Sequence, residues 1–132
     1  MDEVIVRLRE VTSLVLGAAF VWVGIQHFWN VEFFAPIVPN VLGFPHFWVY
    51  ASGIAEITLG LGMIYQRSRK QSALATASFL VIVYWANFNM WVNDIPIDGT
   101  TFSTQAHIGR AFAQFGMIAT ALWIAEIRKE SV

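Results

Sequence analysis

Two charged residues interrupt long apolar segments of this sequence and are the strongest candidates for chemistry: Glu56 and Arg110. Glu56 lies nine residues into the apolar run that begins near residue 47, which places it near the middle of a membrane at about 1.5 Å per helical residue. A carboxylate at that depth must be protonated, paired or in contact with water, so it marks a candidate site. We expect Arg110 to be its partner and assign both residues a catalytic or proton-handling role.

Five further polar residues are candidates for contacting a ligand: Gln26, His27, Asn87, His107 and Gln114. On the last apolar segment, His107, Arg110 and Gln114 are spaced three and four residues apart, which stacks them on one face of a helix. Gln26 and His27 lie near the end of the first segment, and Asn87 lies near the end of the third. This distribution predicts one polar pocket.

Several kinds of chemistry lack their usual residues in this sequence. It has no cysteine, which excludes thiolate metal ligation, disulfide exchange and a cysteine nucleophile. His27, His46 and His107 match no familiar spacing of metal or haem ligands, and no glycine-rich phosphate loop or nucleophile elbow is present. We therefore assign no metal site, and no cofactor held by a motif of the chain itself.

The composition of the chain indicates which secondary structure positions these residues. With 57% hydrophobic and 13% charged residues, the 132-residue chain is too apolar for a soluble domain. Four apolar segments, at about 11–29, 47–65, 72–90 and 104–125, each approach the roughly 20 residues that a membrane helix needs. None alternates between polar and apolar residues, as barrel strands would. We expect a single all-α domain over residues 1–132, an integral membrane four-helix bundle.

The distribution of basic residues predicts the orientation of this bundle. They occur before the first segment, between the second and third, and after the last: Arg7, Arg9, Arg67, Arg69, Lys70, Arg128 and Lys129. By the positive-inside rule, the N and C termini are cytoplasmic in a cell inner (plasma) membrane. The candidate pocket then opens to the outer side. With a net charge of −1 and no basic face, no nucleic acid is expected as a partner.

The predicted outer connection, residues 30–46, combines three prolines with many Phe, Val and Ile residues. Proline prevents a regular helix, whereas the apolar side chains favour burial. Two interpretations stay open: the connection is a lid over a cavity, or it anchors the chain at the membrane interface.

Small residues predict where helices approach closely. Gly17 and Gly24 recur in the first segment, and Gly53 and Gly60 recur in the second, both at seven-residue spacing. In lipid, where apolar side chains gain nothing by leaving solvent, helices associate through close packing at such residues. We therefore interpret these glycines as packing residues.

A set of short motifs, taken in order, resembles the DoxX family of small four-helix membrane proteins. The matching residues are His27-Phe28, Phe34, Ile37-Val38-Pro39, Val49-Tyr50-Ala51-Ser52-Gly53, Glu56, Leu59-Gly60-Leu61-Gly62, Ala86-Asn87, Met90, Arg110 and Gln114. The sequence departs from the family at Asn30-Val31-Glu32, where relatives often have a proline. The residues that match the family's polar pattern are His27, Glu56, Asn87, Arg110 and Gln114.

This resemblance implies a link to membrane redox chemistry, because the related DoxD protein is the membrane subunit of a thiosulfate:quinone oxidoreductase. We expect a non-catalytic or accessory subunit of a quinone-linked, sulfur-related complex, with quinone as ligand and a redox subunit or a second copy as partner, in contact with membrane lipid. One alternative is a binder or carrier of a small molecule or lipid. Another is a structural or assembly subunit in which the polar residues only fix the helix register.

Overall fold

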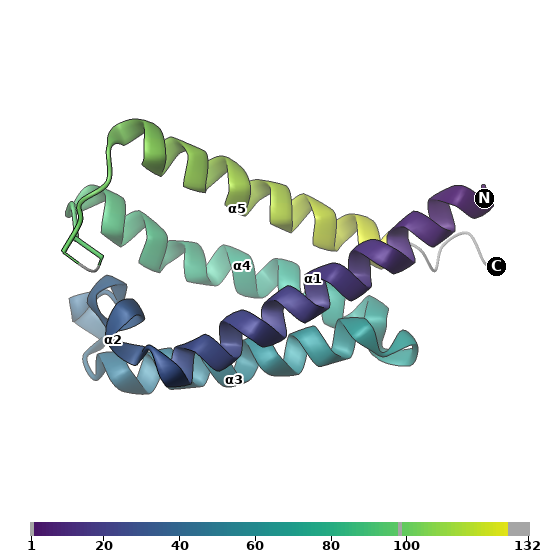
Figure 1. Ribbon diagram of the computed structural model, residues 1–132, viewed down its shortest axis with the longest axis horizontal. Helices are drawn as coiled ribbons and strands as arrows, with labels where there is room; N and C mark the ends of the chain where they lie inside the picture. Colours follow the sequence, from purple (N-terminus) through teal and green to yellow (C-terminus); the bar gives the residue numbers. More distant parts are fainter. Residues whose placement is uncertain (1, 98, 127–132) are drawn as a thin grey trace.

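The computed structural model describes residues 2–97 and 99–126, and these are all-helical (Figure 1). The four long helices are α1 (Glu3–Trp29), α3 (Pro45–Ile64), α4 (Arg69–Val92) and α5 (Thr104–Ala125). The connections contain the short helix α2 (Val31–Phe34) and the 3-10 turns η1 (Ala35–Ile37), η2 (Asn40–Leu42) and η3 (Gln66–Ser68). Within the described ranges the only β contact is an isolated bridge between Ile97 and Thr100.

The helix ends follow from local capping. The Asp2 side chain accepts a hydrogen bond from the Val4 amide, so α1 begins at Glu3 rather than near residue 11. Pro45 occupies the start of α3, where its missing N–H costs no helical hydrogen bond. Ser103 accepts from the Ala106 amide, and α5 covers the predicted segment 104–125.

The long helices pack mainly in two pairs, α1 along α3 and α4 along α5, with less contact between the pairs. In the first pair the backbones approach so closely that a Cβ added at Gly17 would lie 2.7 Å from the Gly60 carbonyl oxygen. A Cβ at Gly24 would lie 2.7 Å from the Gly53 carbonyl oxygen. The prediction that these glycines serve close helix packing is therefore confirmed.

The outer surface of the described chain is apolar. Three helical stretches are long and apolar enough to cross a membrane: Pro45–Ile64, Gln66–Val92 and Thr104–Ala125. Large apolar side chains such as Trp22, Ile82 and Phe112 are exposed on α1, α4 and α5. A surface of this kind is compatible with a membrane protein, because lipid, unlike water, favours contact with such side chains.

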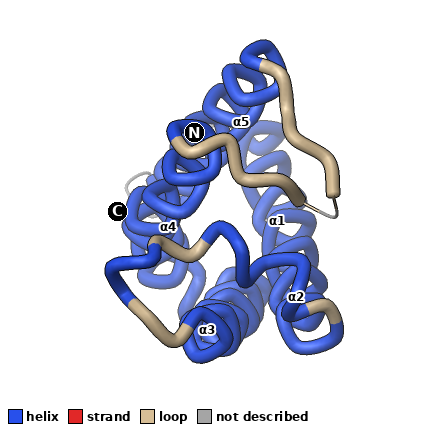
Figure 2. Tube along the Cα trace, turned by 90° about the vertical axis from the view of Figure 1, so that its left-hand side faces the viewer, coloured by secondary structure: helices blue, strands red, loops and turns tan. Residues whose placement is uncertain are grey.

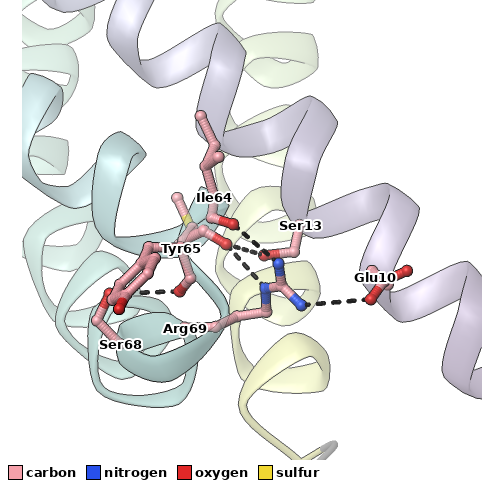
Figure 3. A network of polar contacts seen from close by, with 7 residues as sticks. Glu10, Ser13, Ile64, Tyr65, Ser68 and Arg69 are labelled. Atoms are coloured by element: carbon pink, nitrogen blue, oxygen red, sulfur yellow. Dashed lines mark hydrogen bonds and ion pairs between the residues drawn. The ribbon is translucent and has the colours of Figure 1, made fainter.

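A polar cluster closes the turn between α3 and α4, at the end of the molecule where α1 begins and α5 ends (Figures 1 and 3). The buried Arg69 donates from Nε to the Met63 carbonyl (2.8 Å) and from Nη2 to the Ile64 carbonyl (3.0 Å). Its Nη1 lies 4.0 Å from Glu10 Oε2. Ser13 Oγ donates to the Met63 carbonyl at 2.7 Å. We call these four side-chain contacts the Arg69 cluster.

The Arg69 cluster satisfies carbonyl groups at the C-terminus of α3 that have no partner within the helix. A second buried arginine lies at the same end of the molecule: Arg9 Cζ is 5.2 Å from the centre of the Trp123 ring, and its Nη2 is 3.7 Å from Glu126. The sequence identified these arginines only as orientation signals, and the structure gives both a packing role. Arg128 and Lys129 lie outside the described residues.

Candidate functional site

A cavity of about 440 Å³ lies among α1, α3, α4 and the connection that contains α2, η1 and η2. Most of its lining is apolar, and four lining residues are polar: His27, Ser52, Glu56 and Asn87. Cavities of this size with a few convergent polar groups are typical of small-molecule sites. The structure thus brings together three of the residues proposed from sequence, namely His27, Glu56 and Asn87.

Glu56 is the least satisfied polar residue of this cavity. Its Oε2 is buried and has no hydrogen-bond partner among the described residues. The nearby Ser52 hydroxyl donates to the Val49 carbonyl at 3.0 Å and so is already engaged. Burying a polar atom without a partner costs free energy. A ligand with a hydrogen-bond donor would remove that cost.

The predicted pairing of Glu56 with Arg110 is wrong. Arg110 Nη2 donates instead to Asn87 Oδ1, and its Nη1 lies 3.1 Å from His107 Nδ1. The reason is helix adjacency: α5 packs along α4, so the Arg110 side chain meets Asn87 on α4 before it could reach α3. Arg110 therefore does not line the cavity. It holds the Asn87 side chain, which does.

Three residues predicted to contact a ligand do not line the cavity. Gln114 is buried and donates from Nε2 to the Leu80 carbonyl (2.8 Å), which fixes α5 against α4. His107 is buried against Trp91, with ring centres 5.6 Å apart and nearly parallel planes. Gln26 accepts a hydrogen bond from the Asn30 side chain. His107 and Gln114 are absent from the lining because α5 forms no wall of the cavity. Gln26 is absent because it does not lie on the face of α1 that carries His27.

His27 is held in a defined orientation at the cavity. Its Nδ1 lies 2.7 Å from the Val23 carbonyl oxygen, so Nδ1 is the nitrogen that donates. Its ring stacks on Phe34, with centroids 4.0 Å apart. Nε2 makes no hydrogen bond to another described residue and is available as an acceptor. The three histidines take part in separate contacts, since His46 pairs with Glu32 and His107 with Arg110.

Residues 31–42, which we call the lid segment, cover the cavity. The segment crosses from α2 toward α4 and returns to the start of α3 (Figure 2). It contributes five lining residues: Phe34, Ile37, Val38, Pro39 and Leu42. Asn89 on α4 donates to the Ile37 carbonyl at 3.0 Å, and Glu32 pairs with His46 at the start of α3. The segment therefore covers the cavity, as one of the two interpretations predicts, and anchoring at the membrane interface stays a prediction.

Sequence reasoning missed the rest of the lining. The apolar side chains of Val23, Trp48, Ile82, Val83 and Trp85 belong to the cavity wall, but nothing distinguishes them in the sequence from residues that face lipid. The tie between Asn89 and the lid segment was also missed. Its signal was present, because Asn89 is a second amide side chain two residues after Asn87 in an apolar segment.

Comparisons with known proteins place the chain in a family without assigning an activity. No curated protein and no solved structure was found to match it. A family model described as "Domain of unknown function (DUF8561)" matches residues 16–125. This range includes every residue that lines the cavity. The chain therefore belongs to the DUF8561 family.

Proposed function

We propose that this chain is a four-helix integral membrane protein of the cell inner membrane, with both termini on the cytoplasmic side. Three of its long helices meet the length and hydropathy of a membrane span, and α1, with 27 residues, packs closely along one of them. The basic residues Arg9 and Arg69 lie at the end where α1 begins and α5 ends. Their position supports this end as cytoplasmic.

We further propose that the cavity binds a small lipid-soluble molecule of the quinone class. The observation that carries this proposal is the Glu56 carboxyl group, whose Oε2 is buried without a partner in a mainly apolar cavity. Asn87 complements it: its Oδ1 accepts from Arg110, which leaves the amide N–H groups for a ligand. A quinol hydroxyl could donate to the Glu56 carboxylate and accept from the Asn87 amide, whereas a quinone carbonyl could accept from Asn87 and from a protonated Glu56.

In this proposal the protein is an accessory subunit of a membrane redox complex, and a partner subunit supplies the electrons. The resemblance of its motifs to the DoxX family supports the redox link. The chain contributes a binding cavity and a carboxyl group that can exchange a proton with a bound quinol. Arg110 acts as a positioning residue for Asn87 rather than as a direct ligand.

The test is native mass spectrometry of the protein purified in mild detergent, combined with lipid and quinone extraction. We expect a bound quinone in the wild type and its loss in Glu56→Leu, which removes the carboxyl group while keeping similar volume. Glu3→Gln is the matched control, because Glu3 is an exposed carboxylate outside the cavity. Equal quinone occupancy in wild type and Glu56→Leu would refute the role of Glu56. A wild type purified from quinone-containing membranes without quinone would refute the ligand class.

A second candidate function is a lipid or small-molecule binder that takes no part in electron transfer. The apolar character of twelve of the sixteen lining residues favours it. The two functions differ in their partner: a redox subunit should copurify with the protein in the first and not in the second.

A further inference from the structure

We infer that the ligand enters the cavity sideways from the bilayer, between α3 and α4, and that it is an uncharged amphiphile with a hydroxyl or carbonyl head group. This inference rests on the proposed binding function and adds the route of access and the chemistry of the head group. It does not depend on the ligand being a quinone.

Packing restricts the other sides and one end of the cavity. Between α1 and α3, a Cβ at Gly24 would meet the Gly53 carbonyl at 2.7 Å, so no passage exists along that seam. Between α1 and α4, the buried Phe20 packs against Phe79, with ring centroids 6.4 Å apart. The lid segment closes the end of the cavity, with Pro39 in its lining and buried, and with Asn89 holding the Ile37 carbonyl.

The side between α3 and α4 carries most of the exposed lining. Four lining residues of the described chain are themselves exposed: Val23 (38%) on α1, and Trp48 (40%), Ile82 (69%) and Trp85 (49%) on α3 and α4. We call the last three the rim, and because three of the four lie on α3 and α4, we place the mouth of the cavity between these helices. Figure 1 shows α3 and α4 converging toward the turn at η3 and diverging toward the lid segment. The rim residues belong to the half of each helix that is further from this turn.

The rim is suited to lipid and not to water. All three of its side chains are large and apolar, and they lie on helical stretches that meet the length and hydropathy of a membrane span. A mouth of this kind would be poorly hydrated, and it would admit the apolar body of a molecule already dissolved in the bilayer.

The polar lining defines the head group. None of the described residues that line the cavity is Lys or Arg, and the Arg110 guanidinium is engaged by Asn87 and His107 and lies 5.7 Å from the centre of the Phe102 ring. Phosphate and carboxylate head groups are recognised by such cations. The free groups here are a carboxyl oxygen, an amide and an imidazole nitrogen, which suit a neutral head group that both donates and accepts hydrogen bonds.

The absence of cysteine from the chain makes the route testable by labelling single cysteines in proteoliposomes. Ser52→Cys places a thiol in the cavity, and Val41→Cys places one on the lid segment, where Val41 is 82% exposed. Each variant is treated with a lipophilic N-alkyl maleimide and with a charged, membrane-impermeant maleimide. Labelling after denaturation gives the total thiol, and retained thermal stability shows that each variant folds.

We expect the Val41→Cys thiol to react with both reagents. Each Ser52→Cys rate is divided by the Val41→Cys rate with the same reagent, which corrects for the reagents' different reactivity. The corrected Ser52→Cys rate should be at least about tenfold higher for the lipophilic maleimide than for the charged one, because only the lipophilic maleimide partitions into lipid. Adding Ile82→Trp to narrow the rim should slow the lipophilic reaction. Equal rates with both reagents, or no labelling of folded Ser52→Cys, would overturn lateral access. Neither result bears on quinone occupancy, which mass spectrometry measures separately.

The head-group class is tested by protection of the same thiol. Monoolein, which has an uncharged diol head, should slow lipophilic labelling of Ser52→Cys, and oleate at equal membrane concentration should not. Stronger protection by oleate than by monoolein would overturn the assignment of a neutral head group.

Discussion

The Arg69 cluster and the cavity that contains Glu56 are two polar regions of the same molecule. They differ in whether the buried polar atoms have hydrogen-bond partners. Both place a charged residue type between helices. In the first, the buried guanidinium donates to two carbonyls and lies within 4.0 Å of Glu10. In the second, Glu56 Oε2 is buried with no partner in the described chain. The first region is complete without a ligand, and the second is not.

This difference distinguishes polar residues that stabilise the fold from polar residues that could bind a ligand. A buried polar network whose members are satisfied stabilises one arrangement of helices. A buried oxygen without a partner opposes folding, and a ligand that donates a hydrogen bond to it would offset that cost. Burial alone does not distinguish the two cases, since the Arg69 side chain and Glu56 Oε2 are both buried.

Replacing Arg69 should have the largest effect on stability. Arg69→Met leaves the Ile64 carbonyl without its donor and the Met63 carbonyl with Ser13 alone. We expect a loss of about 2–4 kcal/mol in the free energy of unfolding, mainly from these two charge-assisted hydrogen bonds. Thermal unfolding in detergent measures it. Arg67→Met is the matched control, because Arg67 is exposed in the same turn. Equal effects of the two substitutions would remove the distinction drawn for the Arg69 cluster.

Adding a methyl group at Gly60 should have the next largest effect. A Cβ there would lie 2.5 Å from the Gly17 carbonyl oxygen, so Gly60→Ala must separate α1 from α3 and should destabilise the protein by about 1–3 kcal/mol. Gly116→Ala on α5 meets no atom within 4 Å, and should raise stability by up to about 1 kcal/mol through helix propensity. If both substitutions change the unfolding temperature in the same direction, the seam is looser than the structure indicates.

Glu56→Leu should raise the free energy of unfolding, whereas Arg69→Met should lower it. It removes a buried oxygen without a partner, so we expect the ligand-free protein to gain about 1–2 kcal/mol in stability while it loses its ligand. Unfolding of delipidated protein measures the first change, and mass spectrometry measures the second. A destabilised Glu56→Leu variant would mean that the carboxyl group has a structural partner, and the contrast with the Arg69 cluster would fail.

The smallest effect is expected at the lid segment. Asn89→Leu removes the hydrogen bond to the Ile37 carbonyl, worth about 1 kcal/mol, together with an exposed one that Asn89 Oδ1 accepts from Asn93 at the end of α4. Amide hydrogen exchange of residues 31–42 should accelerate by up to about fivefold, while that of α1 and α3 stays unchanged. Acceleration spread over all helices would show that Asn89 supports the whole fold instead of the lid segment.

Much of the helical architecture was predictable because it depends on local sequence. Apolar length is a local signal, and it predicted the bounds of α5, whose N-terminus Ser103 caps in the structure. The recurring Gly17, Gly24, Gly53 and Gly60 likewise predicted close helix packing, because small residues on one face permit close contact, and the structure shows that this packing joins α1 to α3. The site was predictable only in part, and His27, Glu56 and Asn87 were brought together as expected.

The sequence by itself indicated that Glu56 is an acid within an apolar helix and that His27 and Asn87 lie toward the ends of theirs, because axial position follows from position along a helix. The tertiary structure decided which helix each polar side chain meets. Because α5 lies next to α4, Arg110 donates to Asn87, and Glu56 Oε2 has no partner among the described residues. The course of the lid segment closes one end of the cavity. Periodicity fixes the face of a helix, but the neighbour of that face depends on how all the helices pack together.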